Sequence, residues 1–270
     1  MMETSANYKN KILMYHEVTN IPEREKQIRK IDPAYSLPSR QFEEQMVYLQ
    51  NSEYAVISLD GVCDNPLTSL KSVIITFDDG LIGNYEHAFP ILQKYNFTAA
   101  FFVVVDRITK SRYMNWKQLR ELHQDGHLIQ SHTMTHPMLG ECNEKQIYYE
   151  LDKSKKIIEN KIGNVVKYLS LPFGSSNIKV IRIAKKVGYS AVFTSRLNEL
   201  QISKSPYYFG RIPVKDSYGL DVFNGLLSGR SNFYYKILFF DYIKNKLKRL
   251  IGLNNYRRIY RTVNKIKLEK

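Results

Sequence analysis

The sequence predicts an α/β fold whose parallel sheet closes into a barrel. From residue 11 to about residue 215, short runs rich in β-branched and aromatic residues alternate with amphipathic segments. Parallel strands need crossover connections, and the resulting sheet is either covered on both faces or closed into a barrel. The number of strand runs favours the barrel; they span residues 11–15, 54–58, 72–77, 98–105, 127–131, 167–171 and 190–194.

The segments between these runs have helical spacing and helix-end signals. Two of them place apolar residues on one helical face: Phe42, Met46 and Leu49 in the first, and Trp116, Leu119 and Leu122 in the second. Asn143 with Gln146 resembles a capping box that opens a helix to about Ile162. Gly188 is expected to end a further helix that begins near Ser176.

The composition is that of an ordinary soluble protein. Hydrophobic residues make up 43% of the chain and charged residues 24%, which argues against a disordered or fibrous protein. Cys63 and Cys142 stand too far apart for a disulfide framework or a zinc knuckle, and residues 1–10 lack the pattern of a secretory signal. The longest apolar run, residues 99–105, is far shorter than the roughly 20 residues of a membrane-spanning helix. We therefore expect a cytoplasmic protein.

A strongly basic segment follows the alternating region. The chain carries a net charge of +14, and residues 236–270 hold eleven Lys and Arg against two acids. We predict a catalytic domain over residues 11–216 and a basic helical extension over residues 217–270, with Ile243, Leu247 and Leu250 on one face. Such a helix could lie on the anionic inner face of a membrane or pack on the barrel with its bases in solvent. Nucleic-acid binding is not favoured, because no reader motif is present.

Three groups of reactive residues follow strand runs directly, at the end where parallel α/β barrels place their active sites. The first group is Asp78-Asp79-Gly80, after residues 72–77. Two adjacent carboxylates at the end of a buried strand are costly unless a cation or a proton accompanies them. Taken by itself, the motif could also be an ordinary Asp-Gly turn.

Two histidines form the second group. His132 and His136 follow residues 127–131 and stand four residues apart, a spacing that on one helical turn points both imidazoles the same way. Together with the acidic pair they offer an Asp-His-His set, which would leave coordination positions open for water and substrate. The pattern therefore predicts a catalytic rather than a structural metal site.

The third group is Pro172-Phe173-Gly174, after residues 167–171. A proline followed by a flexible glycine at a strand end could aim backbone N–H groups at a reacting oxygen. It could equally form an ordinary loop, so this motif carries weight only beside the other two.

In their order along the chain, these motifs resemble those of a known enzyme family. TFDDG at residues 76–80, HTMTH at residues 132–136 and PFG at residues 172–174 resemble the motifs of the NodB-like polysaccharide deacetylases, carbohydrate esterase family four. The tryptophan-containing segment 114–116 adds to the likeness, which covers about residues 11–215. The resemblance implies a distorted (β/α) barrel of about seven strands, a divalent metal that is usually zinc, and a hydrolase that deacetylates sugars.

The resemblance also assigns roles to individual residues. Asp79, His132 and His136 would bind the metal, and Asp78 would be the general base. Zinc lowers the pKa of water to about 7, and Asp78 would take the proton as the water attacks the acetamide carbonyl. The Phe173 backbone N–H would hold the developing oxyanion. The residues expected to contact the oxyanion or the sugar are Phe173, Pro172 and Trp116, the last of which is equally placed to begin a helix face.

Two positions depart from the family pattern. Ser170 stands where many members have an arginine that holds the catalytic aspartate. No histidine follows His136, although the family often supplies its general acid from a late Leu-x-His; the corresponding segment here is GRIP at residues 210–213. The orientation of Asp78 must therefore come from elsewhere in the chain, and so must the acid.

His16 is the candidate for the acid. It follows Leu13-Met14-Tyr15 at the end of the first strand run, and the pair Tyr15-His16 resembles the Tyr-His that opens a family branch with circularly permuted motifs. In that branch the resemblance implies that the early histidine protonates the leaving amine. A hydrogen-bonded structural histidine is the alternative.

The resulting prediction is a metal-dependent deacetylase that acts on the N-acetylated sugars of a polysaccharide or of a lipid-linked glycan. A catalytically silent carbohydrate-binding protein that keeps the metal site is one alternative, but a binding protein has no use for Asp78 as a base. An O-deacetylase is the other, because both reactions pass through the same kind of oxyanion.

Overall fold

Each of the seven predicted strand runs forms a strand. The structure, a computed structural model, describes residues 10–22, 33–64, 71–195 and 207–229, together with Phe239 and Ile243. The predicted strands are β1 (Asn10–Tyr15), β4 (Ala55–Val56), β5 (Ser72–Phe77), β6 (Ala99–Val103), β7 (Leu128–Ser131), β8 (Tyr168–Ser170) and β9 (Ala191–Phe193). Every residue of β5 and β6 is buried, as expected for parallel strands that are covered on both faces.

Four further strands were not predicted. They are β2 (Glu17–Thr19), β3 (Ser36–Pro38), β10 (Tyr208–Phe209) and β11 (Ile212–Pro213). Each has only two or three residues, too few to show a hydrophobic period in the sequence. β2 and β3 pair with each other in a small separate sheet.

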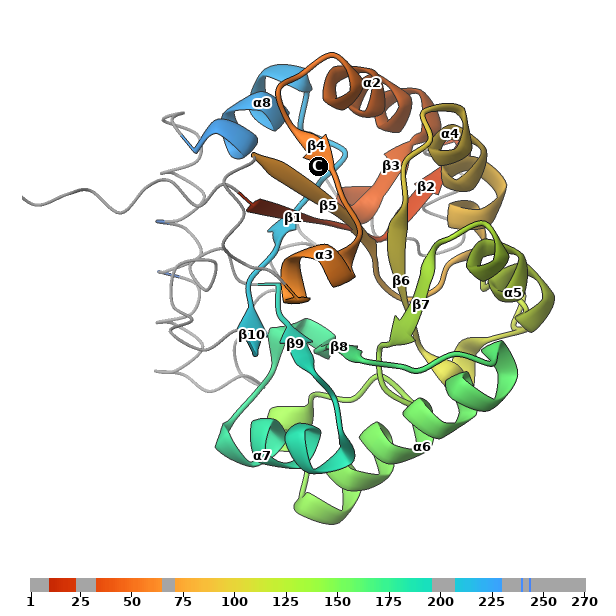
Figure 1. Cartoon of the computed structure of the whole chain (residues 1–270), viewed down its shortest axis with the longest axis vertical. Helices are drawn as coiled ribbons and strands as arrows, with labels where there is room; N and C mark the ends of the chain where they lie inside the picture. The colour runs from red at the N-terminus through yellow and green to blue at the C-terminus, as the bar shows by residue number, and fades with distance from the viewer. Residues whose placement is uncertain are drawn as a thin grey trace, which may run out of the picture.

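The remaining strands form one curled parallel sheet. Its order is β10-β9-β8-β7-β6-β5-β1-β11, and β4 pairs with β5 outside this path. β10 and β11 lie at opposite ends of the sheet, yet only Gly210 and Arg211 separate them in the chain. The two ends of the sheet must therefore lie close together, and the sheet curls into a distorted barrel (Figure 1). The predicted fold class is confirmed.

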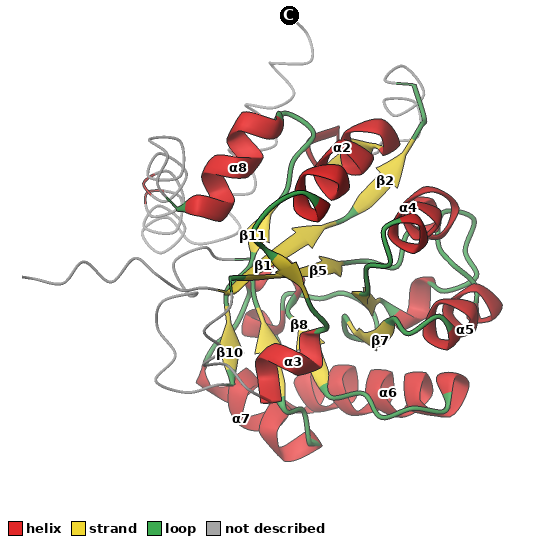
Figure 2. Ribbon diagram, turned by 45° about the horizontal axis from the view of Figure 1, so that its top comes forward, coloured by secondary structure: helices red, strands yellow, loops and turns green. Residues whose placement is uncertain are grey.

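Helices cover the outside of the barrel (Figures 1 and 2). These α-helices are α2 (Ser39–Gln50), α4 (Phe89–Lys94), α5 (Trp116–Gln124), α6 (Glu144–Ile162), α7 (Ile178–Val187) and α8 (Leu220–Ser228), with the π-helix η2 (Asn84–Ala88) leading into α4. Short 3-10 helices are η1 (Pro33–Tyr35), η3 (Val105–Arg107), η4 (Leu139–Glu141) and η5 (Pro172–Gly174). The buried faces of α2 and α5 carry the apolar residues that the spacing predicted, although Trp116 is only half-buried.

The predicted helix ends are confirmed in α6 and α7. Asn143 and Gln146 form a reciprocal capping box at the start of α6, and this helix ends at Ile162. α7 ends before Gly188, whose φ of 89° lies in the left-handed region that favours glycine at this position.

The core has two parts. The larger part lies between the sheet and the surrounding helices. The smaller part fills the barrel interior and consists of Ile12, Leu59, Ile74, Ala100, Phe102, Tyr168, Ala191 and Phe193. Leu59 belongs to the short helix α3 (Leu59–Asp64), whose Asp60 accepts hydrogen bonds from the Tyr168 hydroxyl at 2.5 Å and from Lys167 Nζ at 3.2 Å. α3 thus lies against the start of β8, at the amino end of the barrel.

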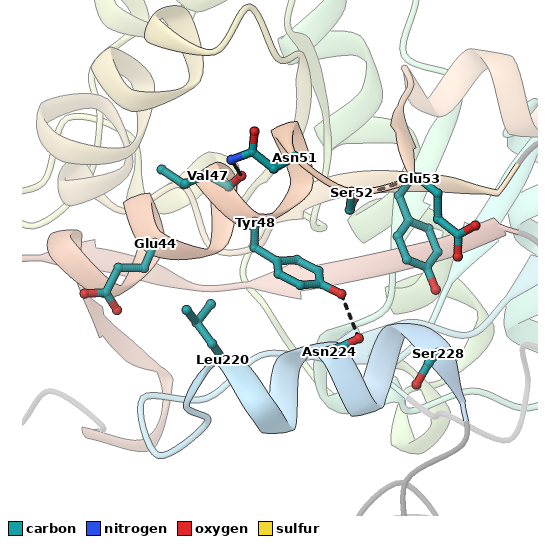
Figure 3. A pocket seen from close by; sticks show the side chains of 10 residues that line it. Glu44, Val47, Tyr48, Asn51, Ser52, Glu53, Leu220, Asn224 and Ser228 are labelled. Carbon is teal, nitrogen blue, oxygen red and sulfur yellow. Dashed lines mark hydrogen bonds between the residues drawn. The ribbon is translucent and has the colours of Figure 1, made fainter.

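α8 packs beside α2. Gln41 Nε2 donates to the Tyr218 carbonyl at 2.6 Å, and the Tyr48 hydroxyl donates to Asn224 Oδ1 at 2.7 Å. The two helices and the residues just after α2 line a surface pocket (Figure 3). None of the predicted catalytic or metal-binding residues lines this pocket.

The predicted basic extension is described only in part. Its first residues include α8, and beyond residue 229 only Phe239 and Ile243 are described, both exposed. The predicted positions of Leu247 and Leu250 lie outside the described residues. Among the residues that the structure does describe, no helix combines the length and apolar character needed to cross a bilayer.

Candidate active site

The carboxyl ends of four strands bring the predicted residues together. His16 directly follows β1, Asp78 and Asp79 follow β5, His132 and His136 follow β7, and Pro172 with Phe173 follows β8 by one residue. In a parallel barrel these ends lie on the same rim, so residues more than 150 positions apart meet at one place.

Asp78 is held by a buried arginine. The Asp78 residue is 2% exposed, and Arg211 is fully buried. Arg211 Nη1 donates to Asp78 Oδ1 at 2.8 Å and Nη2 donates to Oδ2 at 2.6 Å, which makes a bidentate pair. Ser170 Oγ also donates to Asp78 Oδ2, at 3.0 Å. Arg211, together with Ser170, therefore orients Asp78 in place of the arginine that this chain lacks in the motif.

Sequence reasoning missed Arg211. It lies between β10 and β11, where the barrel closes, and its guanidinium lies over the Phe102 ring in the barrel interior at 5.3 Å from the centroid. In the sequence, this segment stands out from the family's late motif by its lack of a histidine and not by its arginine. The available signal was a single arginine just ahead of the short apolar run Ile212-Pro213-Val214.

The surroundings of Asp78 keep it ionised. Burial by itself raises the pKa of Asp78, but the charge of Arg211, then that of His132, and the hydrogen bonds from Arg211 outweigh burial. The net pKa of Asp78 lies well below its ordinary value. Asp78 is therefore ionised at neutral pH, the state that a general base requires.

Asp79, His132 and His136 form a compact donor set. One candidate ligand atom of each lies within 4.8 Å of the others. His132 Nδ1 lies 2.9 Å from the Ser170 carbonyl oxygen, which fixes a proton on Nδ1 and leaves the Nε2 lone pair on the side of Asp78, 3.9 Å from Oδ2. His136 Nε2 lies 3.4 Å from Asp79 Oδ1. This mixture of one carboxylate and two imidazoles suits a divalent metal such as zinc.

The electrostatics of His136 also suit a metal ligand. Burial, followed by the neighbouring His132, lowers the pKa of His136 to about 3, so its imidazole is neutral at pH 7. Only the neutral ring offers a lone pair to a metal.

The two histidines do not lie on a helical turn, contrary to the reasoning from their spacing. Residues 132–136 form a non-helical loop, in which Thr133 has a φ of 71° and His136 a φ of 68°. These left-handed conformations turn the chain so that both rings face the same place, with their centroids 4.8 Å apart. The predicted proximity is correct, but its geometric cause was wrong.

Asp79 has a second partner that sequence reasoning did not identify. Arg107, the last residue of η3, donates from Nη1 to Asp79 Oδ1 at 2.9 Å. Burial raises the pKa of Asp79, but His132, followed by His16, His136 and Arg107, outweighs it, and the net pKa is lowered.

His16 lies at the same rim. Its pKa is lowered by burial, although Asp79 and Asp78 are close enough to oppose this effect. Its ring lies 4.6 Å from the Tyr35 ring, and Asn84 Nδ2 donates to its backbone carbonyl at 2.7 Å. Its Nδ1 is buried without a hydrogen-bond partner among the described residues, and the role of His16 as the acid stays a prediction.

The remaining predicted residues differ in their surroundings. Phe173 is 53% exposed, has a φ of 59° and places its ring 4.8 Å from that of His136, while Pro172 is buried. Trp116 begins α5 and packs against the main core. Its segment approaches the site through Met114, whose N–H donates to the Gly80 carbonyl at 3.0 Å. A contact of Trp116 with a sugar stays a prediction.

Comparison with solved structures defines the class of fold. The Streptococcus pyogenes deacetylase PplD, solved in complex with acetate, has a TM-score of 0.73 and 23% sequence identity to this chain. The likeness covers 80% of this chain and 97% of that one. The barrel described above is thus the fold of a known deacetylase.

Comparison of sequences identifies the family. Residues 66–192 match the family model for polysaccharide deacetylase. The poly-β-1,6-N-acetyl-D-glucosamine N-deacetylase of Staphylococcus aureus strain MRSA252 is 27% identical over 220 residues, which cover 75% of this chain and 74% of that protein. The Bacillus subtilis strain 168 protein YxkH, named as a polysaccharide deacetylase, is 28% identical over 217 residues, covering 79% of this chain and 74% of that protein. This chain contains a polysaccharide deacetylase domain, a hydrolase domain of carbohydrate esterase family four.

Proposed function

We propose that this protein is a metal-dependent deacetylase that removes acetyl groups from the N-acetylated sugars of a polysaccharide. One observation carries the proposal: a buried, ionised carboxylate, Asp78, lies beside a separate donor set for a metal. The name of the Staphylococcus aureus relative supports β-linked N-acetylglucosamine as the sugar.

Asp79, His132 and His136 would hold the metal, and zinc fits their mixture of nitrogen and oxygen donors best. When bound, such an ion polarises a carbonyl and lowers the pKa of water to about 7. Asp78 is not among these three donors, and Arg211 and Ser170 hold its two oxygens in place. That separation supports Asp78 as a base rather than a fourth ligand.

The chain's own residues divide the remaining chemistry among them. Asp78 accepts the proton of the attacking water, since its low pKa keeps it ionised at neutral pH. The backbone N–H of Phe173 stabilises the negative charge that develops on the acetyl oxygen. His16 donates a proton to the nitrogen as the C–N bond breaks and the amine leaves. The proton that Asp78 takes from the water balances the one that His16 gives to the amine, and its transfer to nearby His16 completes the cycle.

The test is acetate release from β-1,6-linked N-acetylglucosamine oligomers by the zinc-loaded chain. Asp78→Asn should lower kcat by about 10² to 10⁴, the usual contribution of a general base, while zinc stoichiometry stays unchanged. His16→Gln should lower acetate release from the sugar by a similar factor but leave hydrolysis of an aryl acetate nearly unchanged. A phenolate leaves without protonation, so this contrast separates an acid from a structural histidine.

Two outcomes would replace the proposal. Zinc and oligomer binding without any acetate release would indicate a silent carbohydrate-binding protein. Release from O-acetylated but not from N-acetylated oligomers would indicate an O-deacetylase.

A further inference from the structure

A single carboxylate from α6 holds the loop that carries the two histidines. Glu150 is buried, with 6% of its surface exposed. Its Oε2 accepts the backbone N–H of Met134 at 2.9 Å and that of Thr135 at 2.8 Å, and its Oε1 accepts the Thr135 hydroxyl at 2.6 Å. Met134 and Thr135 are two of the three residues between His132 and His136. Glu150 therefore contacts the backbone that sets the separation of the two rings.

This loop needs external support because of its conformation. Thr133 and His136 both have positive φ, which non-glycine residues rarely adopt and which persists only where the surroundings hold it. Within the loop, the N–H of His136 donates to Thr133 Oγ1 at 3.0 Å. On one side, the backbone of η3 fixes the loop, with the Asp106 N–H donating to the Met134 carbonyl at 2.9 Å. On the other side, Glu150 supplies the contacts.

The position of Glu150 is itself fixed. One turn further along α6, Ser154 Oγ donates to the Glu150 carbonyl at 2.6 Å and lies 2.9 Å from Ser131 Oγ. Ser131 is the last residue of β7 and its Oγ accepts the N–H of Thr133 at 3.2 Å. α6 and the loop are thus joined at two successive turns of the helix, so the carboxylate cannot shift without the helix.

We propose that Glu150 is a positioning residue for the metal site: by binding the backbone between His132 and His136 it keeps both imidazoles in the arrangement that one ion requires. The proposal rests on the metal site of the proposed function. Glu150 acts through its reach, meaning the side-chain length that places an acceptor oxygen at the loop, and not through its charge. Both backbone N–H groups bind that same oxygen. The amide of a glutamine has such an oxygen, and its NH₂ could donate to Thr135 Oγ1, because a hydroxyl can also accept.

Three variants of Glu150 separate reach from charge. Glu150→Gln keeps the reach and loses the charge, and its zinc affinity should stay within about threefold of the parent's. Glu150→Asp keeps the charge but is one methylene too short, and Glu150→Met has the length without an acceptor. Both should weaken zinc binding by about 10- to 100-fold, the usual effect of losing a group that supports metal ligands. Glu141→Gln, at an exposed position near the start of α6, is the matched control and should bind zinc like the parent.

Zinc affinity is measured on the full chain by competition with a chromophoric chelator, and folding is checked by thermal unfolding in excess EDTA. If the parent binds no zinc, the metal dependence of the proposed function fails, whatever Glu150 does. If the parent binds zinc and folded Asp and Met variants bind equally tightly, the role of Glu150 is refuted. Equal weakening by Gln and Asp would also refute it, because loss of charge would then matter as much as loss of reach. Should the Met variant not fold, the Gln and Asp pair still decides.

Discussion

The buried pair of Asp78 and Arg211 shows how a charged side chain can be accommodated in a barrel interior. Arg211 has five N–H donors, and each has an acceptor: the Thr194 carbonyl, Thr76 Oγ1, Ser170 Oγ and the two oxygens of Asp78. A buried guanidinium with all donors satisfied and a carboxylate opposite it avoids the large penalty of an isolated buried charge. Removing either partner alone restores that penalty.

We therefore predict a non-additive double-mutant cycle. Arg211→Met should lower the free energy of unfolding by about 3–5 kcal/mol, because Asp78 would be buried without its partner. Asp78→Asn should also destabilise, since Arg211 keeps its charge. The double variant should be less destabilised than the sum of the two single variants, as measured by urea unfolding of the metal-free chain. Additive losses would contradict the coupling read from the hydrogen bonds.

The second prediction at this scale concerns pH and His136. The pKa of His136 is about 3 in the folded chain and about 6.5 when unfolded, so the unfolded state binds more protons between these values. Stability is then fully present above pH 6.5 and is lost as the pH falls toward 3; from pH 7 to pH 5 the loss is about 2 kcal/mol. His16, whose pKa burial also lowers, adds in the same direction.

The measurement is thermal unfolding in excess EDTA at pH 5, 6 and 7. His136→Gln should show a flatter dependence than the parent, because glutamine does not titrate. A parent whose melting temperature rises on acidification over this range would contradict the prediction.

At the scale of elements, the strands are regular and the chemistry lies in the strained turns after them. Six non-glycine residues in the described parts of the chain have positive φ. Four of these lie at the candidate site, namely Asp79, Thr133, His136 and Phe173. Backbone in sparsely populated conformations needs support from neighbouring elements, and here that support includes α6 and η3.

α6 supplies part of that support, and its start is fixed by a capping box. Asn143→Ala removes the side-chain acceptor for the Gln146 N–H and should cost about 1 kcal/mol of stability. Glu150 lies about two turns further along the helix, so we expect zinc affinity to stay unchanged while the melting temperature falls. Asn164→Ala, in an exposed loop after the same helix, is the control and should change neither quantity. A loss of zinc affinity in Asn143→Ala would show that the helix start and the site are coupled.

At the scale of the whole molecule, the barrel depends on a short segment that joins the two ends of its sheet. β10 pairs with β9 and β11 pairs with β1, so residues 208–213 connect strands from opposite ends of the strand order. The same segment carries Arg211 into the barrel. This one segment therefore both closes the barrel and orients the candidate base, Asp78.

We predict that this closure is energetically important. Ile212 in β11 is fully buried, and Ile212→Ala should lower the free energy of unfolding by about 2–5 kcal/mol. Ile178 at the start of α7 is 86% exposed, and Ile178→Ala should change it by less than about 0.5 kcal/mol. Chemical unfolding of both variants checks the pair, and similar small effects would mean that β11 contributes little to the barrel.

The sequence by itself determined seven of the described strands, their parallel arrangement and the gathering of the motif residues. The runs that became β5, β6 and β7 carry local hydrophobic patterns, and a parallel sheet necessarily brings the residues after its strands to one rim. Asp78, Asp79 and His132 could therefore be placed together from the sequence alone. The helix ends at Asn143 and Gly188 were equally local signals.

Only the tertiary structure decided which residues hold that site in place. Arg211 meets Asp78 across 133 residues, and Glu150 meets the Thr135 backbone from the next helix. The sequence of a short segment does not reveal which buried group its charged side chain will pair with. The left-handed turns at Thr133 and His136 likewise depend on contacts from α6 and η3 rather than on their own residue types. Local physics selects the elements, whereas the pairing of buried polar groups is settled only when the barrel closes.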